Sequence, residues 1–157
     1  MRHLKISIPH QQLYVYVDGV LASTYSVSTA SNGPGELKNS GCTPRGKHYI
    51  RAKIGADLPL NAVFVGRRFT GEIFSEALAQ HFPQRDWILT RILWLSGLEV
   101  GVNRLGNFDT MQRYIYIHGP PDSEPMGLPL SHGCIRMRNA DLVELFEQID
   151  AGTVVQI

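Results

Sequence analysis

The chain has 157 residues, of which 43% are hydrophobic and 18% are charged, and its formal net charge is +1. This length fits a single domain, 1–157, with room for a sizeable core. The balanced charge offers no basic face for nucleic acid, and no stretch approaches the roughly 18 apolar residues of a membrane span, so we expect neither partner.

The N-terminus shows no export signal. Such a signal needs an apolar core of roughly 7–15 residues, and Lys5, Pro9 and the pair Gln11-Gln12 interrupt any such core. The sequence therefore favours a cytoplasmic protein, or a periplasmic one if a leader has been removed. Its two cysteines fit free thiols in a reducing compartment better than a disulfide scaffold.

Seven segments are predicted to be strands, and in most of them apolar and polar residues alternate with period two, as in half-buried strands. In LYVYV the aliphatic residues share one face and the tyrosines the other, and the following Asp18-Gly19 pair predicts a two-residue hairpin turn. The segments are Leu4–Ile8, Leu13–Val17, Val20–Ser28, His48–Ile54, Ile88–Leu95, Tyr114–His118 and Thr153–Ile157.

One helix is predicted clearly, with Asn139 as its N-cap and Gly152 after its end. A weaker helix is predicted over Ser75–His81, before Pro83. Four apolar residues of the first helix follow the i, i+3, i+4, i+7 spacing of a buried face: Leu142, Leu145, Phe146 and Ile149.

Many short strands and few helices predict a mainly β domain of the sandwich or barrel kind. Two long loops, Thr29–Gly46 and Gly119–Leu130, interrupt the strands, and loops of such length in a compact domain are often functional. The segment 57–106 is predicted to supply core strands and a surface hairpin, or alternatively a cap over a site.

Within that segment, two tryptophans and two arginines need an interpretation. Trp87 and Trp94 are expected in the core because of their apolar area. Arg67 and Arg68 could meet a substrate carboxylate, but we expect them to be solvated.

Cys134 lies in the stretch SHGCIRM. A free cysteine is often a buried apolar filler, but Gly133 permits a tight turn whose N–H groups could form an oxyanion hole. Arg136 and the start of the predicted helix should lower the thiol pKa below its usual value of about 8.5. These neighbours favour a nucleophile. We expect Cys42, the other cysteine, to be a packing residue.

A thiol nucleophile needs a base, and His118 ends the strand YIYIH that precedes the proline-rich loop. A third group should orient the imidazole. Asp109 and Asp122 are possible carboxylate partners, and nothing in the spacing selects either. Alternatively, His118, His132 and Cys134 could offer three ligands to zinc in a metal-binding or wall-binding module.

The stretch IHG (Ile117–Gly119) followed by SHGCIRM (Ser131–Met137) resembles the catalytic signature of the YkuD-type L,D-transpeptidases. Two weaker matches are CTPRGKH (Cys42–His48), similar to the family's threonine-proline-x-glycine segment, and VSTAS (Val27–Ser31), similar to the strand end before it. The matches span roughly Leu4 to Ile157. The sortases also use cysteine, histidine and arginine, but their histidine lies far upstream of the cysteine.

The resemblance implies a β-sandwich-like catalytic domain with one or two helices, and no cofactor or metal. It implies that Cys134 attacks an amide carbonyl and carries a thioester, and that His118 is the base, oriented by the backbone carbonyl of Gly119. The N–H groups of Gly133 and Cys134 would bind the oxyanion. The site would be lined by Ser131, His132 and Arg136.

The implied substrate is a peptidoglycan tetrapeptide, free or within a muropeptide, cut between the L-centre of diaminopimelate and the terminal D-alanine. Typical members are exported and often carry a wall-binding module, whereas this chain resembles the short, leaderless branch of L,D-carboxypeptidases. We therefore expect water as acceptor, in murein recycling. The alternative is an L,D-transpeptidase whose amine acceptor gives 3–3 cross-links or D-amino-acid exchange. Asp122 or Glu124 is expected to meet the diaminopimelate ammonium.

Overall fold

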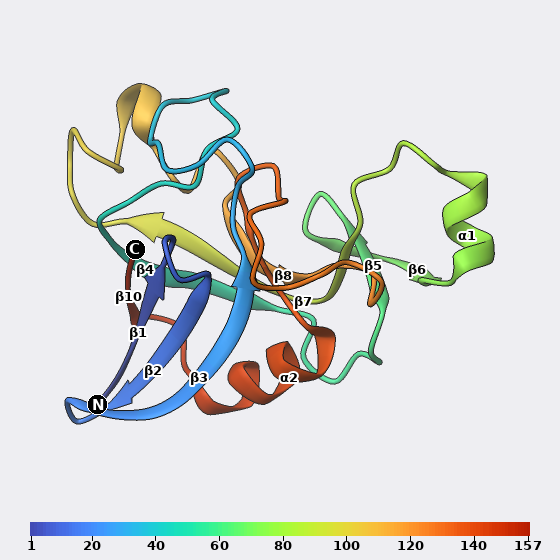
Figure 1. Cartoon of the computed structure of the whole chain (residues 1–157), viewed down its shortest axis with the longest axis horizontal. Helices are drawn as coiled ribbons and strands as arrows, with labels where there is room; N and C mark the ends of the chain where they lie inside the picture. The colour runs from blue at the N-terminus through green and yellow to red at the C-terminus, as the bar shows by residue number, and fades with distance from the viewer.

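A computed structural model describes residues 1–157 as one curved sheet of ten strands with two short α-helices (Figure 1). In chain order the elements are β1 (Arg2–Ser7), β2 (Gln12–Val17), β3 (Val20–Ser28), β4 (Lys47–Ile54), β5 (Ala62–Val65), β6 (Arg68–Ile73), α1 (Glu76–His81), β7 (Ile88–Gly97), the 3-10 turn η1 (Gly106–Phe108), β8 (Tyr116–Gly119), β9 (Ile135–Met137), α2 (Asn139–Gln148) and β10 (Val154–Gln156). The mainly β class is as predicted.

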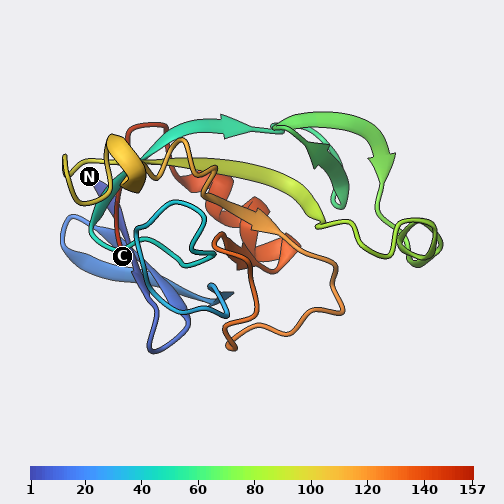
Figure 2. The same ribbon diagram turned by 90° about the horizontal axis from the view of Figure 1, so that it is seen from above.

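The sheet closes on itself through eight of its strands. Its order is β4-β10-β1-β2-β3-β9-β8-β7, and β4 pairs with β7 as well as with β10. The first part of β7 pairs instead with β5, which continues into β6. This hairpin and α1 project together from the closed part, to the right in both views (Figures 1 and 2).

The main core fills the closed sheet and is completed by α2. It contains 18 buried residues, among them Leu13 and Val15 on the inner face of β2 and Leu142 and Leu145 of α2. Each such aliphatic side chain contributes about 1.5–3 kcal/mol when fully buried. The period-two alternation is therefore confirmed for β1 and β2, and so is the apolar helix face, whereas β7 and β8 are buried on both faces.

Two local predictions are also confirmed. Asp18 and Gly19 have φ of 49° and 80°, the left-handed pair that a two-residue hairpin turn requires. Ser75 caps α1, because its hydroxyl accepts the N–H of Leu78 at 3.1 Å. No helix is long and apolar enough to cross a membrane.

Three predictions need correction. Strand β8 begins at Tyr116 and not at Tyr114, because Tyr114 adopts a left-handed φ of 57°, far from the extended backbone of a regular strand. The N-cap of α2 is Arg138, because the Asn139 side chain is drawn into contacts outside the helix. Trp94 is half-buried under an aromatic cluster at the surface, whereas Trp87 is buried.

Candidate active site

Five of the predicted site residues line one cavity of about 440 Å³, whereas Gly119 and Gly133 lie next to lining residues in the chain but do not line it themselves. The loop before β9 supplies Ser131, His132 and Cys134, β9 supplies Arg136, and β8 supplies His118. The turn between β5 and β6 borders the same cavity. The loop 29–46 lies beside the loop 119–134 (Figure 2), and a hydrogen bond from the Ser31 N–H to the Ser131 carbonyl joins the two loops.

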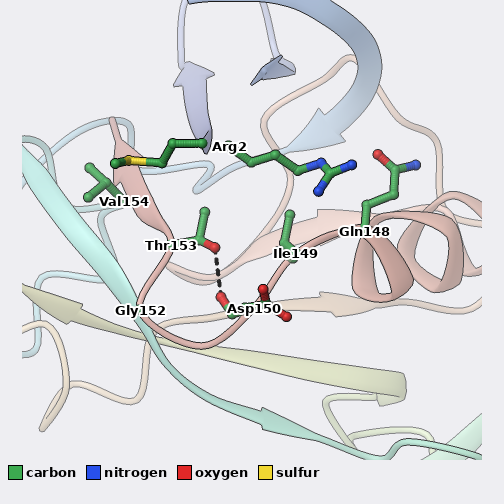
Figure 3. A pocket seen from close by; sticks show the side chains of 8 residues that line it. Arg2, Gln148, Ile149, Asp150, Gly152, Thr153 and Val154 are labelled. Carbon is green, nitrogen blue, oxygen red and sulfur yellow. Dashed lines mark hydrogen bonds between the residues drawn. The ribbon is translucent and has the colours of Figure 1, made fainter. Parts of the chain in front are cut away.

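A separate hollow of about 340 Å³ lies between the start of β1 and the end of α2 (Figure 3). It is lined by Arg2, Gln148 and Asp150, among others, and Thr153 Oγ1 closes a local turn on the Asp150 carbonyl at 2.7 Å. This hollow contains no cysteine or histidine, and none of the predicted site residues lines it.

His118 is buried with its imidazole held in one orientation. Nδ1 lies 2.8 Å from the carbonyl oxygen of Gly119, and because a carbonyl only accepts, Nδ1 carries the proton. Burial lowers the pKa of His118 below its usual 6.5. The imidazole is therefore neutral near pH 7, with Nε2 free to accept a proton. Neither candidate aspartate contacts this ring.

Both aspartates have other partners. Asp109 accepts the N–H groups of Leu105 and Gln112, at 2.6 and 2.8 Å, and so fixes its own loop. Asp122 accepts a hydrogen bond from Asn139 Nδ2 at 2.9 Å and lines a small hollow outside the cavity. The orienting group is thus a backbone carbonyl, and Asp122 is not placed to meet a substrate in the cavity.

The Cys134 thiol lies between two backbone groups. It accepts the Tyr116 N–H at 3.3 Å and donates to the Tyr114 carbonyl at 3.4 Å. Although the residue as a whole is half-buried, desolvation of the sulfur raises the thiol pKa to about 12, against the smaller lowering effects of the Tyr116 N–H and two arginines. The predicted lowering of this pKa is wrong, because desolvation of the sulfur outweighs the lowering effect of Arg136.

The turn that carries Cys134 is fixed from both sides. Gly133 has φ of +132°, a conformation that favours glycine. Ser131 Oγ donates to the Cys134 carbonyl at 2.5 Å and accepts the Gly133 N–H at 3.3 Å. Thr43, from the TPRG segment, donates to the Gly133 carbonyl at 2.9 Å. The Cys134 N–H has no acceptor in the protein, so it is the donor available to an oxyanion.

Charged side chains surround the mouth of the cavity. Arg136 is 9% exposed, with Asp86 Oδ1 at 3.7 Å and Glu124 Oε2 at 3.9 Å. His132 is exposed, and its Nδ1 lies 3.9 Å from the same Asp86 oxygen. Asp86 lies in the connection between α1 and β7, and no sequence pattern singled it out.

Arg67 and Arg113 line the same cavity. Arg113 donates to the carbonyls of Gly35 and Cys42, at 3.2 and 2.6 Å, and thereby ties the loop 29–46 to the site. Arg67 is half-exposed and not simply solvated as expected, because its guanidinium packs on Trp94 and contacts the Tyr116 hydroxyl. Arg68 is exposed as expected.

Asn139 holds the segment whose carbonyl orients His118. Its Nδ2 donates to the Pro120 carbonyl at 2.8 Å, and its Oδ1 accepts the hydroxyl of Thr90. A Cβ added at Gly119 would collide with that Oδ1. Thr90 itself has φ of 78°, rare for a β-branched residue and typical of strained functional sites.

We expect an Asn139→Ala variant to lose about 1–3 kcal/mol of unfolding free energy, because buried polar groups lose their partner. The pKa of His118 should also rise toward its usual value as the Gly119 segment loosens and water enters. Urea denaturation and NMR titration of the imidazole measure the two effects, with exposed Arg138→Ala as control. Unchanged stability and an unchanged titration would show that Asn139 positions nothing.

The three side chains considered as zinc ligands do not form a metal-binding group. No three His, Cys, Asp or Glu side chains come close enough together to hold a metal ion. Cys42 and Cys134 are both free thiols. The arrangement of His118 and Cys134 suits proton transfer and acyl transfer instead.

Curated relatives match only part of the chain. The probable L,D-transpeptidase YbiS of Escherichia coli is 48% identical over 44 residues, which cover 28% of this chain and 14% of the relative. The probable L,D-transpeptidase ErfK/SrfK of Salmonella typhimurium is 47% identical over 45 residues, 29% of this chain and 15% of the relative. The aligned segment is thus a small part of these relatives.

Solved structures share the whole fold at low sequence identity. The alignment with L,D-transpeptidase 3 of Mycobacterium tuberculosis covers 99% of this chain and 60% of that protein, with a TM-score of 0.60 and 16% sequence identity. The alignment with an L,D-transpeptidase of Enterococcus faecium covers 99% of this chain and 48% of that protein, with a TM-score of 0.59 and 17% sequence identity. The family model for the YkuD L,D-transpeptidase catalytic domain matches residues 1–157. The chain therefore belongs to the YkuD family of L,D-transpeptidase catalytic domains.

Proposed function

We propose that this protein is a cysteine L,D-carboxypeptidase that removes the terminal D-alanine from a peptidoglycan tetrapeptide through a thioester on Cys134. The observation that carries the proposal is the pairing in one cavity of this thiol with a neutral, buried imidazole whose Nδ1 is fixed on the Gly119 carbonyl. The relatives named as L,D-transpeptidases support the same bond and substrate class.

In the first half-reaction one proton moves from the Cys134 thiol to His118 and then from His118 to the leaving amine. The thiol turns from the Tyr114 carbonyl toward His118 Nε2 and passes its proton there, while Sγ bonds to the carbonyl carbon of the diaminopimelate L-centre. The Cys134 N–H, with the Gly133 N–H once that group leaves Ser131 Oγ, stabilises the oxyanion. The C–N bond then breaks, and the imidazolium returns the proton to the leaving amine of D-alanine.

The second half-reaction regenerates the thiol. Water gives a proton to His118 Nε2 as its oxygen bonds to the thioester carbon, and the C–S bond breaks. The imidazolium then protonates the departing sulfur. Because Nδ1 stays bonded to Gly119 throughout, one imidazole orientation serves both half-reactions.

The charges around the cavity favour this substrate and water as the acceptor. The free end of diaminopimelate carries an ammonium and a carboxylate, which complement the acids Asp86 and Glu124 beside Arg136. An adjoining hollow of about 450 Å³ shares Arg113 and His132 with the cavity and is also lined by Lys38, but by no carboxylate. An ammonium acceptor would find no carboxylate partner there, which favours hydrolysis. We place this reaction on recovered wall fragments in the cytoplasm.

The test is incubation with the diaminopimelate tetrapeptide, alone and with a second D-amino acid, followed by mass spectrometry. We expect loss of D-alanine under both conditions and little exchange product. Predominant exchange would identify the amine-dependent L,D-transpeptidase reaction instead. No reaction under either condition would contradict acyl transfer from this substrate, and cleavage of a sorting-signal peptide would favour the sortase type.

A further inference from the structure

Of the three arginines that line the cavity, Arg67 uses the fewest of its hydrogen-bond donors within the protein. Arg113 uses its guanidinium on the carbonyls of Gly35 and Cys42 and on the Ser40 hydroxyl. Arg136 donates to the Leu130 carbonyl and lies beside two acids. Arg67 makes one hydrogen bond, 3.0 Å from Nη1 to the Tyr116 hydroxyl, and pairs with no carboxylate.

The Arg67 guanidinium is held in place although it is not neutralised. Its centre lies 4.8 Å from the ring of Trp94 and 4.6 Å from that of Tyr114, so two aromatic faces fix its plane. A planar guanidinium that is fixed in this way is preorganised for a bidentate carboxylate.

The backbone at this turn places the same side chain at the cavity. Gly66 and Arg67 form the two-residue turn between β5 and β6, with φ of 55° and 63°. Asparagine, aspartate or glycine is the usual residue at the second position. A non-glycine residue held in a left-handed conformation beside an active cavity is typical of a functional position.

Tyr116 relates this cation to the nucleophile. Its N–H is 3.3 Å from Cys134 Sγ, and its hydroxyl accepts the hydrogen bond from Arg67. The guanidinium therefore lies about one tyrosine side chain away from the thiol, along the wall of the cavity. A substrate whose scissile carbonyl lies at Sγ would have its next residue within the span between the two groups.

We propose that Arg67 binds the terminal carboxylate of the substrate, on the leaving D-alanine, and so restricts the enzyme to peptides with a free C-terminus. This inference rests on the proposed function for the identity of the peptide. It assigns Arg136 and its acidic neighbours to the free end of diaminopimelate and Arg67 to the residue that is released. Arg67, in the β5–β6 turn, would then select for a free C-terminal carboxylate, which Cys134 and His118 do not recognise.

The experiment measures peptide binding by calorimetry in a Cys134→Ala background, where no turnover occurs. The probes are the tetrapeptide, its C-terminal carboxamide, and a tetrapeptide with lysine in place of diaminopimelate, which lacks the side-chain carboxylate. Arg67→Gln should weaken binding of both free acids about 10- to 100-fold and leave the carboxamide unaffected. The exposed neighbour Arg68→Gln is the matched control and should change none of the three.

Two outcomes would overturn the inference. One is equal affinity for the tetrapeptide with and without the Arg67→Gln substitution. The other is a loss of affinity in Arg67→Gln that persists with the carboxamide but disappears with the lysine peptide, because Arg67 would then bind the side-chain carboxylate of diaminopimelate. Arg67→Lys, which retains charge without the stacked fork, should lose less affinity and guards against a folding defect. Wild-type turnover is measured separately, so failed hydrolysis with intact carboxylate-dependent binding would reject the proposed function alone.

Discussion

Replacing Cys134 by alanine is expected to reduce D-alanine release from the tetrapeptide by on the order of 10⁴-fold or more. The thiol lines the same cavity as the buried imidazole, and its sulfur accepts the Tyr116 N–H at 3.3 Å. Without it, no thioester forms, and the backbone N–H that remains at this position can only stabilise a direct attack by water. Chromatography of released D-alanine measures the effect.

The matched control is Cys42→Ala. Cys42 is the second free thiol, and its Sγ contacts only backbone carbonyls of its own loop, Asn32 at 3.5 Å and Ser40 at 3.7 Å. We expect this variant to stay within a few-fold of the wild-type rate. Equal losses in both variants would point to a general packing role for thiols, and full activity of Cys134→Ala would reject the nucleophile.

The second large effect concerns the protonation of the resting site. Burial raises the pKa of Cys134 to about 12 and lowers that of His118 below 6.5. Between these two values both groups are neutral, so the free enzyme holds a thiol beside an imidazole and not a thiolate–imidazolium pair. The His118 proton is gained only as the pH falls below the usual histidine value, so kcat/KM should stay level down to and below pH 6.5 before it declines.

Direct observation of the thiol gives the sharpest form of this prediction. At neutral pH, alkylation of Cys134 should be about 10³-fold slower than that of a cysteine with the ordinary pKa of about 8.5, because less thiolate is present. A Cys42→Ala background ensures that one cysteine titrates. An ultraviolet thiolate signal present near neutrality, lost in the additional Cys134→Ala variant, would show that an ion pair exists and that our account of the resting state is wrong.

The sequence predicted those features that depend on local pattern. Alternation in Leu13–Val17 placed the inner face of β2, and the Asp18-Gly19 pair placed its hairpin, because both effects act between neighbours in the chain. The spacing of Leu142 and Leu145 likewise identified the buried face of α2. The family signature then supplied His118 and Cys134 as a candidate pair, which the fold brings to one cavity.

Features that depend on contacts between distant segments were not predictable in this way. Asn139 looked like an N-cap, but it reaches Pro120 and Thr90, which only the folded sheet brings near. Asp86 gains meaning only beside Arg136. The thiol pKa was misjudged because charge and helix start were visible in the sequence, whereas the desolvation that outweighs them was not.

The left-handed backbone conformations of Tyr114 and Arg67 also depend on contacts between distant segments and were not predictable from the sequence. Tyr114 has strand-forming neighbours, yet its φ of 57° keeps it out of strand β8, and its carbonyl accepts the Cys134 thiol. Arg67 takes a similar conformation in a hairpin turn that has no asparagine, aspartate or glycine at that position. In both cases tertiary contacts stabilise a conformation that local propensity disfavours, which is typical of functional positions.

The most direct test of the central claim is to quench the wild-type protein during turnover of the tetrapeptide and to map the acylated residue by peptide mass spectrometry. We predict a tripeptide acyl group, the substrate less its D-alanine, on the peptide that contains Cys134. An acyl group on Ser131 or any other side chain, or D-alanine release by Cys134→Ala at the wild-type rate, would contradict the thioester mechanism.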